Sequence, residues 1–74
     1  MILLKDDNSW IVISNGLSLE FTVIEDACVH LERNGIKDDD IDMALIEMSI
    51  NNNNKAHFNT EGNFLYTDNT VGEG

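Results

Sequence analysis

A two-residue turn signal near the N-terminus constrains the fold of this chain more than any other feature. Asn15-Gly16 separates residues 10–14, which are rich in aromatic and β-branched side chains, from the alternating run at residues 17–21. Both turn residues accept the positive φ of a type I′ turn, which joins adjacent antiparallel strands. The sequence therefore predicts a β-hairpin over residues 10–21, and with it an antiparallel sheet.

The stretch after the hairpin has the pattern of an amphipathic helix with a capping box. Thr22 and Glu25 have the spacing at which a threonine hydroxyl accepts a hydrogen bond from the glutamate amide and the carboxylate reaches back. Asn34-Gly35 ends this helix, because glycine suits the left-handed position after a last turn. The apolar stripe between these signals consists of Val23, Ile24, Ala27, Cys28 and Leu31.

A second helix is predicted from Asp38 to about Ile50. Three consecutive aspartates open it, and acidic groups are favoured at the positive end of a helix dipole. Four consecutive asparagines at residues 51–54 end it, because asparagine is a poor helix former that favours turns.

Two short apolar runs, at residues 56–58 and 64–66, flank a glycine-containing loop and indicate a second hairpin. With a further apolar run near the N-terminus, the predicted order is β-β-β-α-α-β-β. This order predicts one α+β domain over residues 1–67, in which an antiparallel sheet carries both helices on one face. Residues 68–74 contain few apolar groups, and we expect them to form a flexible tail.

Negative charge dominates the helical half of the chain. The formal net charge is −10 over 74 residues. The stretch from Glu20 to Glu47 contains nine acidic residues and only two basic ones, Arg33 and Lys37. A field of one sign selects partners of the other sign, although charge can also serve only to keep a small protein soluble. The predicted partner-binding acidic patch consists of Glu25, Asp26, Glu32, Asp38, Asp39, Asp40, Asp42 and Glu47.

Motifs for catalysis, cofactors or metals are not found in the sequence. Alternating aspartates from Asp38 match the first ligands of an EF-hand loop, but Met43 stands where that loop needs glycine and Ser49 where it needs glutamate. A glycine-rich phosphate loop, a Ser-His-Asp set and zinc-type cysteine spacing are also missing. We therefore expect a protein that is not an enzyme and that needs no cofactor or metal.

Cysteine content and charge restrict the compartment and the partners. Cys28 is the only cysteine, which favours a reducing compartment, here the cytoplasm, and a role in apolar packing. Apolar runs are too short to span a membrane. The few lysines and arginines argue against direct binding to nucleic acid or anionic membranes.

The second helix has two apolar stripes on nearly opposite sides. One stripe consists of Ile41, Ala44, Leu45 and Met48, and the other of Met43, Ile46 and Ile50. A surface helix normally has one. The second stripe is therefore either covered by the first helix or an interface, for a homodimer or a target. Because a domain of this size has a thin core, we favour the interface.

In size, charge and composition the whole chain resembles the small acidic proteins with which phages inhibit bacterial defence systems, such as anti-CRISPR and antirestriction proteins. Its asparagine-rich, proline-free composition suits an AT-rich phage genome. The resemblance implies an inhibitor in the host cytoplasm that occupies the basic surface of a nucleic-acid-binding protein or complex as a DNA mimic. The alternative is a homo-oligomeric structural or adaptor module without catalytic activity.

Overall fold

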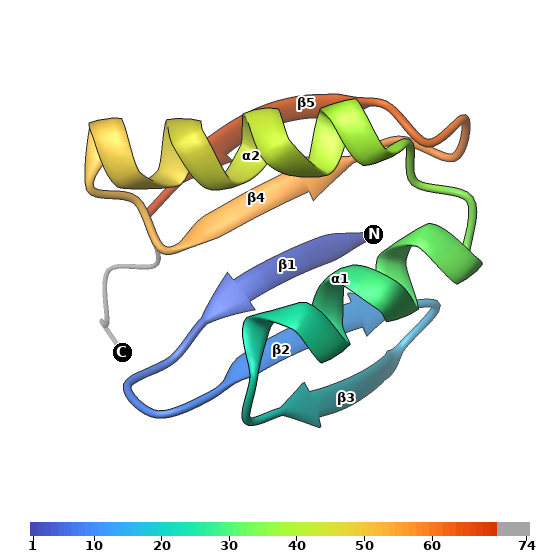
Figure 1. The fold of residues 1–74 in the computed structure, drawn as a ribbon, viewed down its shortest axis with the longest axis horizontal. Coiled ribbons are helices and arrows are strands. Elements are labelled where there is room, and N and C mark those ends of the chain that lie inside the picture. Colours follow the sequence, from blue (N-terminus) through green and yellow to red (C-terminus); the bar gives the residue numbers. More distant parts are fainter. Residues whose placement is uncertain (70–74) are drawn as a thin grey trace.

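A computed structural model describes residues 1–69 and confirms the predicted α+β fold and element order (Figure 1). Its elements are β1 (Ile2–Lys5), β2 (Trp10–Ser14), β3 (Leu17–Phe21), α1 (Ile24–Arg33), α2 (Asp38–Asn51), β4 (Lys55–Phe58) and β5 (Phe64–Asp68). Asp68, which we expected in the flexible tail, belongs to β5 and pairs with Lys55. Residues 70–74 of the predicted tail lie outside the described residues.

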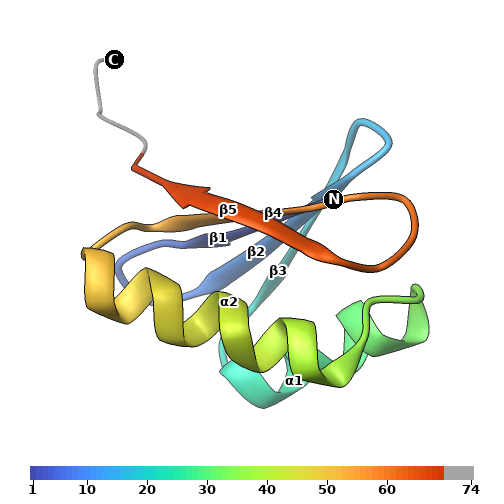
Figure 2. The ribbon, with the colours of Figure 1, turned by 90° about the horizontal axis from the view of Figure 1, so that it is seen from above.

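All five strands pair antiparallel, in the order β3-β2-β1-β4-β5. The N-terminal strand β1 lies at the centre and joins the two hairpins into one sheet. Leu3 of β1 lies opposite Val12 on one side and opposite Ala56 on the other, and all three side chains are buried. Both helices cover this face of the sheet (Figure 2), so the core lies between the helices and these residues.

The predicted N-terminal hairpin is confirmed. Asn15 and Gly16 have φ values of 53° and 80°, as a type I′ turn requires. Ser14 lies opposite Leu17, and the register continues without a break to Trp10 opposite Phe21.

The predicted capping box at the start of α1 is wrong. The N-cap residue is Val23, whose carbonyl accepts hydrogen bonds from the amides of Asp26 (3.1 Å) and Ala27 (3.4 Å). Among residues 1–69, no side chain caps this end. Strand β3 continues through Phe21, so the helix begins one residue later than the capping box requires, and Thr22 lies before the cap.

The predicted glycine stop of α1 is confirmed. Gly35 has a φ of 96°, and its amide donates a hydrogen bond to the Glu32 carbonyl (3.0 Å). The next amide, of Ile36, donates to the Leu31 carbonyl (3.1 Å). These two bonds form a Schellman motif, in which the apolar residue after glycine contacts the last turn. Ile36 and Leu31 are both buried in the core.

Helix α2 ends at the asparagine run, as predicted. Asn52 adopts the left-handed conformation with φ 54°, and the amide of Asn53 donates to the Met48 carbonyl (2.9 Å). One side of α2 packs against the sheet. The buried apolar core consists of Leu3, Val12, Ala27, Leu31, Ile36, Ile41, Ala44, Met48, Ala56 and Phe58.

The exposed position of Thr22 gives a stability test. We expect Thr22→Ala to change the free energy of unfolding by less than about 0.5 kcal/mol, because the hydroxyl caps no helix. Gly35→Ala should lower it by about 1–2 kcal/mol, because alanine is strained at positive φ. Urea denaturation measures both variants. A loss of more than about 1 kcal/mol in Thr22→Ala would restore the capping box.

Candidate functional site

The structure places all eight predicted acidic residues on the two helices. Two of them, Asp40 and Glu47, are half-buried and hydrogen-bonded within the protein. The other six are exposed to solvent. These six form the surface called the acidic surface below: Glu25, Asp26, Glu32, Asp38, Asp39 and Asp42.

Repulsion within the acidic surface is strongest where the end of α1 approaches the start of α2. The side chain of Asp38 raises the pKa of Glu32 above its usual 4.5, first by accepting a hydrogen bond from the protonated glutamate and then by its negative charge, and the charge of Asp42 adds to this. Glu32 therefore holds its proton more tightly than an isolated glutamate does, because Asp38 and Asp42 lie close to it.

Cys28 lies beside this group of carboxylates. Burial is the main cause that raises the pKa of its thiol above 9.0, and the charge of Asp42 adds to it. The thiol therefore stays protonated near neutral pH, where a reactive cysteine would need a lowered pKa. The predicted packing role of Cys28 fits this environment.

Asp40 does not belong to the acidic surface, although the sequence placed it there. Its Oδ1 accepts a hydrogen bond from the Phe64 amide (3.2 Å), and its Oδ2 accepts one from Nδ2 of Asn63 (3.4 Å). These bonds tie the first turn of α2 to the start of β5. The three consecutive aspartates differ because successive helical residues point about 100° apart.

Glu47 also departs from the predicted patch. Its Oε1 accepts a hydrogen bond from Nδ2 of Asn51, one turn later on α2 (3.0 Å). Glu47 is half-buried and therefore less available to a partner than the six exposed acids.

The second apolar stripe of α2 is exposed. Met43 is 49% exposed, Ile46 57% and Ile50 72%, so the alternative in which α1 covers them is excluded. Val29 on α1 is exposed as well. The outer surface of the helix layer thus combines exposed carboxylates with exposed apolar side chains.

A groove of about 610 Å³ lies between the β1–β2 connection and the C-terminal end of α2. Sequence reasoning missed it, because the asparagine run was interpreted only as a helix stop. Lys5 and Trp10 form one wall, with the Lys5 ammonium 5.7 Å from the indole centre. The other lining residues are Asp6, Asp7, Leu45, Met48, Ser49, Asn52, Asn53, Asn54 and Asn69.

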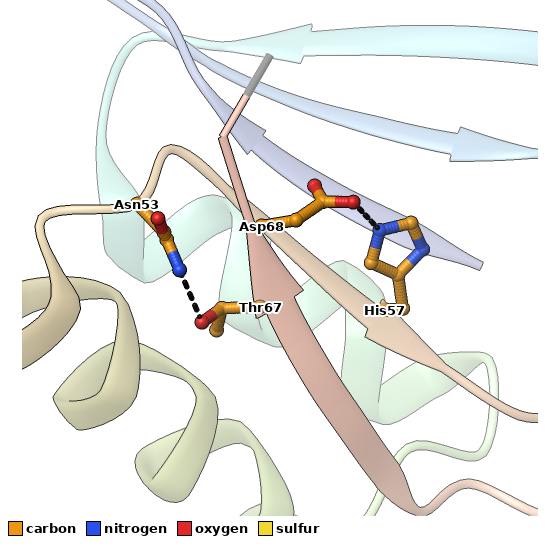
Figure 3. A network of polar contacts seen from close by, with 4 residues as sticks. All are labelled: Asn53, His57, Thr67 and Asp68. Carbon is orange, nitrogen blue, oxygen red and sulfur yellow. Dashed lines mark hydrogen bonds and ion pairs between the residues drawn. The ribbon is translucent and has the colours of Figure 1, made fainter.

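Two polar contacts fix β5 to its neighbours (Figure 3). His57 Nε2 lies 3.2 Å from Asp68 Oδ2, and Nδ2 of Asn53 donates to Oγ1 of Thr67 (2.8 Å). The His57 ring also stacks on Tyr66, with the ring centres 4.3 Å apart. Because each contact joins β5 to β4 or to the α2–β4 connection, this histidine–aspartate pair has a structural explanation.

Comparison of the chain with models of known protein families, with curated proteins and with solved structures finds no match. Within residues 1–69, no three His, Cys, Asp or Glu side chains are placed to hold a metal ion. In the same part of the chain, no helix has the length and apolar character to cross a membrane. A function must therefore be argued from the surfaces themselves.

The raised pKa of Glu32 predicts a pH dependence of stability. The folded protein binds this proton more tightly than the unfolded chain, so the stabilisation is complete below pH 4.5 and is lost as pH rises through the folded-state pKa. Glu32→Gln should therefore raise the melting temperature at neutral pH, and the advantage should vanish on acidification.

Thermal melts at pH values from below 4.5 to neutral measure the effect. Glu47→Gln is the control, because Glu47 lies outside the group of Glu32, Asp38 and Asp42. A Glu32→Gln variant that is less stable than the parent at neutral pH would show that the repulsion is not present.

The exposed stripe predicts unequal effects of charge on the two sides of α2. Ile46→Glu should leave the domain folded, with a loss below about 0.5 kcal/mol, because the new carboxylate stays in water. Ile41→Glu should unfold it, because an unpaired charge would be buried in the core. Circular dichroism distinguishes the two outcomes, and an unfolded, monomeric Ile46→Glu would mean that the stripe is part of a core.

Proposed function

We propose that this protein is a small acidic binding protein that occupies the basic surface of a nucleic-acid-binding protein and thereby inhibits it. The observation that carries the proposal is the set of six exposed carboxylates on α1 and α2. Four of them, Glu25, Glu32, Asp38 and Asp42, lie close enough together to act on the thiol of Cys28. Glu32 and Asp38 repel each other. A basic partner would relieve this repulsion.

The helices give the charges a regular spacing. Glu25 and Glu32 lie two turns apart on α1, a separation of about 10 Å along the helix. Carboxylates held in this way can occupy the lysine and arginine contacts that would otherwise neutralise phosphates. The electrostatic attraction speeds association and makes it sensitive to salt.

The exposed stripe of α2 supplies apolar contact area for an interface, which charge alone does not. Interfaces are depleted of charge at their centres and are often anchored by apolar side chains. Met43, Ile46 and Ile50 are exposed, and Asp39 and Asp42 flank them along α2. Docking of α2 would therefore place an apolar patch next to two carboxylates.

Extended basic surfaces are typical of proteins that bind nucleic acid. The target class that we propose is a bacterial defence complex, such as a CRISPR or restriction nuclease in the host cytoplasm. The resemblance in size and charge to phage inhibitors of these systems supports this choice. The proposed role is occupation of a surface, without catalysis.

A second possibility is a homo-oligomeric module that associates through the stripe of α2. Exposure of the stripe favours it. Net charge opposes it, because joining two copies at α2 would bring two negatively charged helix layers together. A basic target satisfies both the apolar stripe and the charge.

Inhibition assays with purified nucleases test the proposed function. We expect the protein to reduce DNA binding by at least one of a panel comprising a Cas9–guide complex, a Cas12a–guide complex and a type I restriction enzyme. The triple variant Asp38→Asn, Asp39→Asn, Asp42→Asn should weaken inhibition by at least about tenfold, the effect of about 1.4 kcal/mol. Higher salt should weaken the parent as well.

The matched control is Asp6→Asn, Asp7→Asn, Glu61→Gln, which removes the same charge from exposed positions outside the helices. It should inhibit like the parent. Equal losses in both triple variants would show that net charge, and not the acidic surface, is responsible. Inhibition of no nuclease in the panel would contradict the proposed target class.

A further inference from the structure

The strand β3 forms a regular and unprotected edge of the sheet. Its register with β2 is continuous over all five residues, and its sequence contains no proline or lysine. Natural edge strands usually carry such residues or a bulge, which block pairing with another chain. The opposite edge of the sheet has such an irregularity, because the pairing of β4 with β5 shifts between His57 and Phe58. Leu17 and Leu19 of β3 are 71% and 47% exposed.

The free backbone groups of β3 belong to Ser18 and Glu20. In a two-residue hairpin the amide after the turn, here that of Leu17, donates a hydrogen bond back across the turn. Backbone groups alternate in direction along an antiparallel strand. The groups of Leu19 and Phe21 therefore also point toward β2, whereas those of Ser18 and Glu20 point out from the edge.

A second copy of β3 matches this edge. We propose that the protein forms a homodimer in which β3 pairs antiparallel with β3 of a second copy, centred on Leu19. Ser18 then lies opposite Glu20 of the second copy, and these residues exchange their free backbone hydrogen bonds. Leu17 lies opposite Phe21 of the second copy. Apolar side chains meet apolar ones, and no two carboxylates stand directly opposite each other.

The flank of α1 beside β3 supports a second copy as the occupant. His30 lies on this flank, since its ring centre is 5.4 Å from that of Phe21. Asp26 and Arg33 lie four residues before and three after His30, and so share its flank. A two-fold axis perpendicular to the sheet makes the two α1 helices antiparallel. Asp26 of each copy then lies on the same side as Arg33 of the other, and opposite charges meet.

Dimerisation at β3 also keeps like charges apart. The repelling carboxylates Glu32 and Asp38 lie where α1 meets α2, on the other side of α1 from the axis. A hollow of about 180 Å³ beside the edge is lined in part by Leu17, Leu19 and His30, and side chains of an added strand can fill it. The helix layers of both copies face the same way, so the acidic surface apart from Asp26 stays exposed.

Disulfide trapping tests the register. In a Cys28→Ser background, Leu19→Cys places two cysteines opposite each other in the dimer, with Cα atoms about 4.5 Å apart, which a disulfide can span. Leu17→Cys is the matched control. Its side chain is more exposed, but its two copies would lie about 13 Å apart along the strands.

After mild oxidation with diamide, we expect covalent dimer from Leu19→Cys and at least about tenfold less from Leu17→Cys. Equal trapping of both variants would indicate random collision. Failure of Leu19→Cys to form the disulfide would overturn the register.

Charge substitutions opposite Glu20 test the interface in solution. Ser18→Lys should tighten the dimer and Ser18→Glu should weaken it, each by roughly 2- to 30-fold in Kd, because every dimer contains two such cross-strand pairs. Thr60→Lys and Thr60→Glu change the net charge equally in an exposed loop and should have much smaller effects. Sedimentation equilibrium measures all four variants.

A parent protein that is monomeric at high concentration, or Ser18 variants that only match their Thr60 counterparts, would overturn the dimer. The dimer does not depend on the proposed inhibitory function, so a failed nuclease assay leaves it standing. Ile46→Glu separates it from association through α2: the β3 dimer should persist in this variant, and its loss would place the interface on the helix instead.

Discussion

The pairing of β1 with β4 is the interaction on which the rest of the structure depends. It places Leu3 opposite Ala56, residues far apart in the chain, and joins two hairpins that would each be marginal alone. It also makes one continuous apolar face from strands at both ends of the sequence. Helix α1 packs over β2 and β3, whereas α2 packs over β4 and β5, so without β1 in the centre neither helix would have a complete surface to cover.

The same arrangement gathers negative charge. Both helices lie on one face of the sheet (Figure 2), so their outward acids share one surface and repel each other, as the raised pKa of Glu32 shows. Burial of Ile41, Ala44 and Met48 on the inner side of α2 offsets this cost. The fold uses Asp40 to hold β5, and it makes no comparable use of Asp39. The acidic surface therefore remains available to the basic partner that we propose.

Local signals in the sequence predicted the structure well, and signals that depend on distant residues did not. Asn15-Gly16 and Gly35 each determine a turn through their own backbone preferences, and both predictions are confirmed. The Thr22 cap failed because the length of β3, which pairing with β2 determines, moved the start of α1. Asp40 could not be distinguished from Asp38 by sequence, because its hydrogen-bond partners lie in the second hairpin. Strand order likewise depends on β1, whose short apolar run is compatible with several positions in the sheet.

The two unprotected features of the surface suit the two different partners that we propose. The outer side of α2 combines exposed apolar residues with carboxylates of one sign, so a second copy there would meet its own charge, and a basic protein would not. The edge at β3 carries a single charged side chain, Glu20, and beside it α1 presents both Asp26 and Arg33. Self-association there brings unlike charges together, and backbone hydrogen bonds to Ser18 and Glu20 require no particular charge. Because the two features lie on different parts of the molecule, a dimer formed at β3 would present two acidic surfaces on one side to the same basic target. Such a dimer would gain affinity only for targets long enough to contact both surfaces at once, since the second contact then becomes intramolecular.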